Sequence, residues 1–101
     1  RAIAHITGGG LPGNLARVLP ESADAAIDGR SWEPPRIFDE IQRVGEVSDD
    51  EMRKVFNLGI GMVVVVAPEE AHRTLDILRT EGHRAVEIGR ITAGHGNVTF
   101  T

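Results

Sequence analysis

The sequence predicts an α/β (α+β) domain with a mixed, mostly antiparallel sheet of about four strands packed by helices. Three observations predict this class. Short runs rich in β-branched residues alternate with segments whose apolar residues recur at helical spacing. Glycine or proline separates most of these segments. The chain has 101 residues, 41% of them hydrophobic, which suffices for one core and not comfortably for two, so a single domain over residues 1–101 is expected.

The first elements are a strand, a glycine loop and a short helix. Ala2 to Thr7 alternates weakly between apolar and polar residues and runs into three consecutive glycines, as a strand ending in a turn does. Beyond the glycines, apolar residues at helical spacing predict a helix that Pro20 ends. They are Leu11, Leu15, Val18 and Leu19. The run from Ala23 to Ile27 precedes Asp28-Gly29, which predicts a second strand followed by a turn.

Two helices are predicted in the middle of the chain. Pro34-Pro35 opens an amphipathic helix with proline in its first turn and Gly45 just past its end. Its apolar residues are Ile37, Phe38, Ile41 and Val44. Ser48 and Glu51 fit a capping box that opens a second short helix, which is expected to end near Asn57.

The last third of the chain reads as strand, helix and two strands. Val63 to Val66 is dense in β-branched residues and predicts a central strand buried on both faces. A helix from Pro68 to Gly82 is predicted to bury a stripe formed by Ala71, Leu75 and Leu78. Ala85 to Ile91 alternates as a strand, Thr92 to Gly96 forms a turn, and Asn97 to Thr101 is expected to pair back as the last strand.

Composition argues against several classes of function. A net charge of -4, with acidic and basic residues interspersed, gives no broad basic face, so no nucleic-acid partner is expected. The longest apolar run, Met62 to Ala67, is far shorter than the roughly 20 residues of a membrane-spanning helix, so no membrane partner is expected. Cysteine is absent and the histidines lack metal-ligand spacing, so we expect no metal site. We expect a cytoplasmic protein, and the start on strand-like residues without a Met suggests a piece of a longer one.

The strongest candidate site is the glycine loop, Thr7, Gly8, Gly9 and Gly10, with Asn14 beyond it. Glycines between a strand and a helix let the backbone approach a ligand and direct several N–H groups at one anion, such as a phosphate. The spacing matches neither the GxGxxG fingerprint nor the GxxxxGK[ST] P-loop. On spacing alone, a phosphate-binding loop and a plain tight turn both remain open.

Two further residues are candidates for supporting roles. His5 lies just before the loop and could orient a substrate or transfer a proton, although a lone histidine in a strand is more often a hydrogen-bonded structural residue. Asn57 precedes Gly59 and Gly61. These glycines either end a helix or let this backbone pack beside the glycine loop, with Asn57 offering its amide to the site.

Three motifs together resemble a known family. HITGGGL at His5 to Leu11, with Asn14 and RVLP at Arg17 to Pro20 after it, comes first, and FNLGIGM at Phe56 to Met62 comes later. Between them lies a Trp-x-x-Pro run, Trp32 to Pro35, which is expected within a helix. This order is similar to the carboxy-terminal domain of phosphoribosylformylglycinamidine cyclo-ligases, also called aminoimidazole ribonucleotide synthetases, and it covers nearly the whole chain.

The resemblance implies a partly ferredoxin-like domain of a two-domain, usually homodimeric enzyme whose amino-terminal half binds most of the ATP and magnesium. The implied reaction activates the formyl oxygen of formylglycinamidine ribonucleotide with ATP, after which the substrate's own nitrogen closes the imidazole ring. Thr7 to Gly10 and Asn14 would then hold the phosphorylated ribonucleotide substrate, with His5 and Asn57 in support. The catalytic residues stay unknown, and the chain alone is expected to be inactive.

Other readings of the same residues are open. Formylglycinamidine ribonucleotide synthetase, thiamine-monophosphate kinase, selenophosphate synthetase and a hydrogenase maturation factor share this architecture, although the paired glycine motifs favour the cyclo-ligase. A non-catalytic module that binds a small molecule fits the lack of a nucleophile or an acid–base pair. A structural module that forms a dimer would leave the glycines with only a turn to make.

Overall fold

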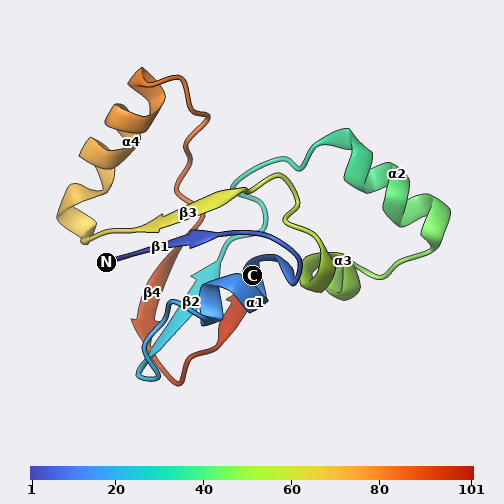
Figure 1. Ribbon diagram of the computed structural model, residues 1–101, viewed down its shortest axis with the longest axis horizontal. Coiled ribbons are helices and arrows are strands. Elements are labelled where there is room, and N and C mark those ends of the chain that lie inside the picture. Colours follow the sequence, from blue (N-terminus) through green and yellow to red (C-terminus); the bar gives the residue numbers. More distant parts are fainter.

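The computed structural model describes residues 1–101 as five strands, four α-helices and one short 3-10 helix (Figure 1). In chain order these are β1 (Ala2–His5), α1 (Gly10–Ala16), β2 (Ala23–Ile27), α2 (Arg36–Gly45), α3 (Asp49–Val55), β3 (Met62–Val65), η1 (Pro68–Glu70), α4 (Ala71–Thr80), β4 (Gly89–Ala93) and β5 (Val98–Phe100). The mixed α/β class with mostly antiparallel pairing is confirmed. The strands form two sheets, of two and three strands, where one sheet of about four was expected.

The three-stranded sheet has β2 at its centre. β4 pairs with β2 antiparallel, and β5 pairs with its other edge in parallel, so the last strand does not pair back on β4 as predicted. The carboxylate of Asp24 in β2 holds the turn that crosses β2, because its Oδ1 accepts hydrogen bonds from the N–H groups of His95 and Asn97 at 2.8 Å each. A Cβ on Gly94 would overlap that carboxylate, so the turn needs glycine where it passes over β2.

The strand predicted over Ala85 to Ile91 is shifted and begins only at Gly89. Gly89 pairs with Ile27, the last residue of β2, so residues 85–88 lie beyond the end of their partner strand. The backbone at Gly89 lies so close to Ala26 that a Cβ there would overlap the Ala26 carbonyl oxygen. The end of β2 therefore sets where β4 can begin.

The two-stranded sheet pairs β1 with β3 antiparallel. The prediction of a central strand for Val63 to Val66 is wrong in this structure, because β3 has one strand neighbour. Met62 and Val64 are exposed on one face, whereas Val63 on the other face packs against the core. The β-branched run does form a strand, as its side chains favour.

The helices follow their capping signals with small shifts. Ser48 Oγ accepts from the Glu51 N–H at 3.2 Å, which confirms the predicted cap of α3, but the helix ends at Val55. α2 begins at Arg36, so the Trp32–Pro35 run lies before the helix, because a residue that precedes proline avoids helical angles. None of the helices combines the length and the apolar composition that a membrane-spanning helix requires.

The buried core lies between β1, α1 and β2. It consists of Ala4, Ile6, Leu11, Leu15, Ala25 and Ile27. α2 and α4 contain no buried residue, so the stripe predicted on α4 is only partly covered. In Figure 1, these two helices extend from opposite sides of the central strands. The core thus lies directly beneath the loop that joins β1 to α1.

Candidate functional site

The loop between β1 and α1 presents its backbone to solvent. Thr7, Gly8 and Gly9 are exposed, and their N–H groups donate no backbone hydrogen bond within the chain. Gly9 has φ 98°, a left-handed conformation that glycine adopts without strain, and it caps α1 without a side-chain hydrogen bond. Successive free N–H groups in such a turn can converge on an anion. These donors belong to the loop that precedes α1, and not to the helix itself, which has only seven residues.

Asn14 fixes the shape of this loop from below. Its side chain is 5% exposed, and Nδ2 donates to the carbonyl oxygens of Gly10 at 2.8 Å, Thr7 at 3.2 Å and Gly8 at 3.3 Å. Its Oδ1 accepts from Thr7 Oγ1 at 3.2 Å. The amide is therefore occupied by the protein, which gives Asn14 a positioning role. Direct contact between Asn14 and a substrate stays a prediction.

Gly10 is the point where the two glycine motifs meet. It is buried with φ 64°, and a Cβ there would overlap the Arg53 carbonyl oxygen and lie 2.8 Å from that of Phe56. The last turn of α3 thus packs directly on the loop. Packing of Gly59 and Gly61 beside the loop was one of two alternatives, and the close backbone approach is made by Gly10.

The segment after α3 contributes in other ways. The Gly61 carbonyl accepts from the Ile6 N–H at 2.8 Å, which extends the pairing of β1. Gly59 has φ 96°, and a Cβ there would press on the ring of Pro35. Asn57 Oδ1 accepts from the Gly59 N–H at 2.8 Å, so its side chain closes a local turn. A contact between Asn57 and a ligand stays a prediction.

His5 is exposed at the end of β1, opposite Met62 in the sheet register. None of its side-chain atoms makes a hydrogen bond within the chain, so the structural alternative of a hydrogen-bonded histidine is not what the structure shows. Its supporting role in binding stays a prediction. The structure thus brings Thr7 to Gly10 and Asn14 into one unit, with His5 at its edge.

Two residues beside the loop were not singled out as site residues. Trp32 donates from Nε1 to the Leu58 carbonyl at 3.0 Å, which ties the loop before α2 to the segment after α3. The guanidinium of Arg53 lies 4.8 Å from the centre of the Phe100 ring, and both line a cavity of about 200 Å³. The Trp-x-x-Pro pattern gave a signal for Trp32, whereas nothing in the sequence pairs Arg53 with Phe100.

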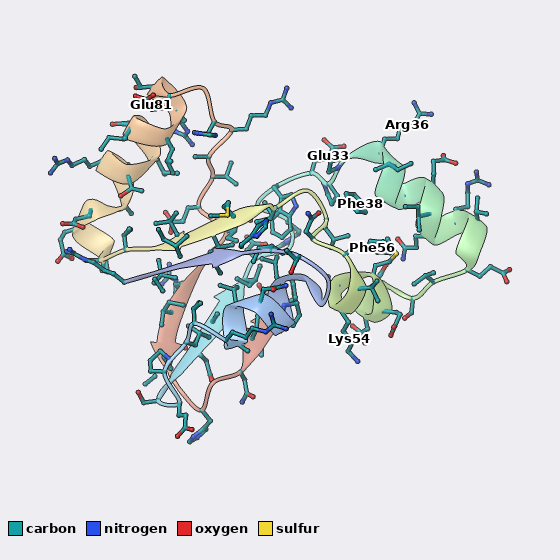
Figure 2. All side chains as sticks on the ribbon, viewed as in Figure 1. Glu33, Arg36, Phe38, Lys54, Phe56 and Glu81 are labelled. Carbon is teal, nitrogen blue, oxygen red and sulfur yellow. The ribbon has the colours of Figure 1, made fainter.

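An aromatic pair joins α2 to α3 at the rim of this cavity. The rings of Phe38 and Phe56 lie 5.7 Å apart at an angle of 60°. Figure 2 shows both between the two helices. Phe56 also lies in the second glycine motif, so the Trp-x-x-Pro run, α2 and both glycine motifs form one connected region.

The carboxyl whose pKa is shifted lies outside the loop. Backbone hydrogen bonds from Asn97 and then His95 lower the pKa of Asp24 in β2, whose carboxyl faces the turn between β4 and β5. No group of three or more histidine and acidic side chains is placed to hold a metal ion. The features of the loop are therefore backbone donors, space and aromatic neighbours.

Comparisons with known proteins agree with the motifs. The family model described as "AIR synthase related protein, C-terminal domain" matches residues 1–101. A phosphoribosylformylglycinamidine cyclo-ligase from Myxococcus xanthus is 44% identical over 99 residues, which are 98% of this chain and 29% of that protein. One from Thermodesulfovibrio yellowstonii is 46% identical over 94 residues, 93% of this chain and 27% of that protein. The chain thus spans less than a third of these relatives, and it belongs to the family of AIR synthase related carboxy-terminal domains.

Proposed function

We propose that this chain is the carboxy-terminal portion of a phosphoribosylformylglycinamidine cyclo-ligase. The enzyme would convert formylglycinamidine ribonucleotide and ATP to aminoimidazole ribonucleotide, ADP and phosphate. The support is the identity of 44% and 46% to proteins of that name across nearly the whole chain. ATP and Mg²⁺ would be held mainly by polypeptide outside residues 1–101, and the full-length enzyme would be a homodimer.

Within that enzyme, we assign the loop from Thr7 to Gly10 to the phosphorylated ribonucleotide substrate. The carrying observation is that Thr7, Gly8 and Gly9 are exposed residues whose N–H groups have no backbone acceptor in the chain. Asn14 and the contact of Gly10 with α3 hold these donors in place before a ligand arrives. Preorganised donors are favourable because little ordering remains to be done on binding.

Such a grip would serve the chemistry by fixing a flexible substrate. Ring closure within one molecule gains most of its rate from holding the two reacting groups close together. Binding the distant phosphate limits the motion of the rest of the substrate. His5, exposed beside the loop, would then act as a supporting contact, and Asn57 would stabilise the neighbouring turn.

Kinetics of the full-length enzyme test this assignment, with Gly8→Ala as the informative variant. No atom lies within 4 Å of a Cβ at Gly8, and its φ lies outside the left-handed region, so the fold tolerates alanine. A methyl group there would occupy the space of the ligand. The N–H of residue 8 remains, so the methyl group acts by displacing the phosphate: we expect the apparent KM for the ribonucleotide to rise about tenfold or more, because one lost hydrogen bond to a charged group costs about 1.5–3 kcal/mol.

Gly13→Ala is the matched control, since a Cβ at Gly13 also meets no atom within 4 Å but lies in α1, outside the loop. It should leave KM unchanged. Gly9→Val should also raise KM or abolish turnover, but φ 98° strains any side chain there, so it is the less specific probe. Unchanged kinetics in Gly8→Ala would contradict the assignment and favour a module in which the glycines only make a turn.

A further inference from the structure

The apolar pattern of the sequence predicts that more side chains are buried than the 101 residues bury by themselves. Four consecutive valines are typical of a strand covered on both faces, yet Val64 is 41% exposed and Met62 57% exposed. The apolar stripe of α4 is only partly covered, and Ile77 on the same helix is 52% exposed. β3 also has one strand neighbour, so its other edge carries backbone groups that are unpaired in a sheet.

The surface area shows the same shortfall. The accessible surface is 7033 Å². A compact monomer of 10.9 kDa is expected to expose about 5,600 Å². The difference is roughly 1,400 Å², which exceeds the approximately 800 Å² that one partner buries in a standard interface. A contact of the size of a stable interface is therefore missing from this chain.

Part of this uncovered surface lines a single groove. It encloses about 560 Å³, and 16 of its 22 lining residues are hydrophobic. β3 and α4 form its walls, with the segment from Arg84 to Ile88 between them and Ile27 of β2 on its floor. Figure 1 shows α4 to one side above β3 and the segment that follows it descending to cross β3, with no helix or strand drawn between α4 and that segment.

We propose that polypeptide preceding Arg1 fills this groove in a protein of the length of the relatives. Arg1 lies at its rim, because its guanidinium pairs with Glu70 at 3.1 Å, next to Ala71 in the lining, and Ala2 pairs with Val65. The relatives are more than three times as long as the matched region, and the family description places that region at the carboxy-terminal end.

Polypeptide fits the groove better than a small ligand does. An apolar molecule could cover the side chains but would leave the free edge of β3 without hydrogen-bond partners. A chain segment supplies both apolar side chains and backbone groups. The inference does not depend on the reaction catalysed.

Thiol labelling of the full-length protein tests the inference. Val64→Cys and Val86→Cys place thiols on groove residues that are each 41% exposed in this chain, and Val55→Cys on α3 is the matched control at 43%. These are small changes in volume, and this chain has no cysteine of its own. In the full-length protein we expect the two groove thiols to react with iodoacetamide at least about a hundredfold more slowly than the control, because labelling then requires local opening of the covering segment.

Three results would overturn it. Labelling of all three thiols at one rate would show that nothing covers the groove. Protection that disappears on dilution, together with a monomer–dimer equilibrium in sedimentation, would assign the groove to a second copy. Protection that appears only when lipid vesicles or an apolar dye are added would assign it to a small apolar ligand. Protection that is independent of protein concentration supports the proposal.

Discussion

α1 and α4 are both amphipathic, yet they differ sharply in how far this chain covers them. The seven residues of α1 include four that are buried, and its neighbour β2 buries every second residue. The ten residues of α4 include none, and neither do those of α2. The helix with the glycine loop at its start is thus part of the core, whereas the two longer helices are peripheral.

This difference separates what the chain can hold by itself from what it cannot. The packed region contains the Asn14 network and the contact of Gly10 with α3, so the loop keeps its shape without any further polypeptide. The peripheral region exposes apolar surface and lacks neighbours. Stability measured on the 101 residues should therefore depend on the packed region and be nearly insensitive to the peripheral one.

The strongest way to break the packed region is Gly10→Ala. The new Cβ would overlap the Arg53 carbonyl, and φ 64° disfavours any side chain. Overpacking and backbone strain together should cost about 3 kcal/mol or more of unfolding free energy. Urea unfolding followed by circular dichroism measures this loss. Gly13→Ala on the same helix has room for its methyl group, and an equal loss in both variants would contradict the contact.

Shortening one leucine side chain in each region compares the two regions directly. Leu11→Ala removes a side chain that is 1% exposed and should cost about 3 kcal/mol, because it leaves a cavity in the core. Leu78→Ala on α4 removes one that is only partly covered and should cost about 1 kcal/mol or less. Both losses can be read from urea midpoints of the 101-residue chain. Equal losses would show that α4 belongs to the core after all.

The smallest effect is expected in acid, at Asp24. Because its folded pKa is lowered below the ordinary value of 3.8, the ionised carboxyl stabilises the fold above that value. This contribution is lost as the pH falls from 3.8 through the lower folded pKa, since the unfolded state takes up the proton first. Asp24→Asn should lack this part of the acid sensitivity. If the unfolding midpoints of the unchanged chain and of Asp24→Asn fall in parallel as the pH is lowered below 5, Asp24 does not contribute to the acid sensitivity.

Local signals predicted the packed region well. Ala23–Ile27 was predicted with the bounds that the structure shows, because turn residues mark its end clearly. The Ser48 cap was predicted from a short-range pattern that does not depend on distant contacts. The glycine loop was identified for the same reason, since its glycines directly follow a strand and precede a helix.

The errors concern partners that lie far apart in sequence. Periodicity showed that Val63 to Val66 forms a strand but could not show that β3 would have one neighbour. The hydrogen bonds that His95 and Asn97 donate to Asp24 span more than 70 residues and hold the turn that leads β5 to the other edge of β2. Asn14 is a local exception: it was expected to hold the ligand, and the structure shows that its amide is occupied by the loop above it.

The most direct test of the account follows the amide resonances of Thr7, Gly8 and Gly9 while the phosphorylated ribonucleotide is added to ¹⁵N-labelled full-length protein. We expect saturable chemical-shift changes of these three amides in the concentration range of KM, with the amide of Gly96 in the β4–β5 turn unchanged. Unchanged chemical shifts of the three loop amides in an enzyme saturated with substrate would contradict the assignment of the loop to the substrate.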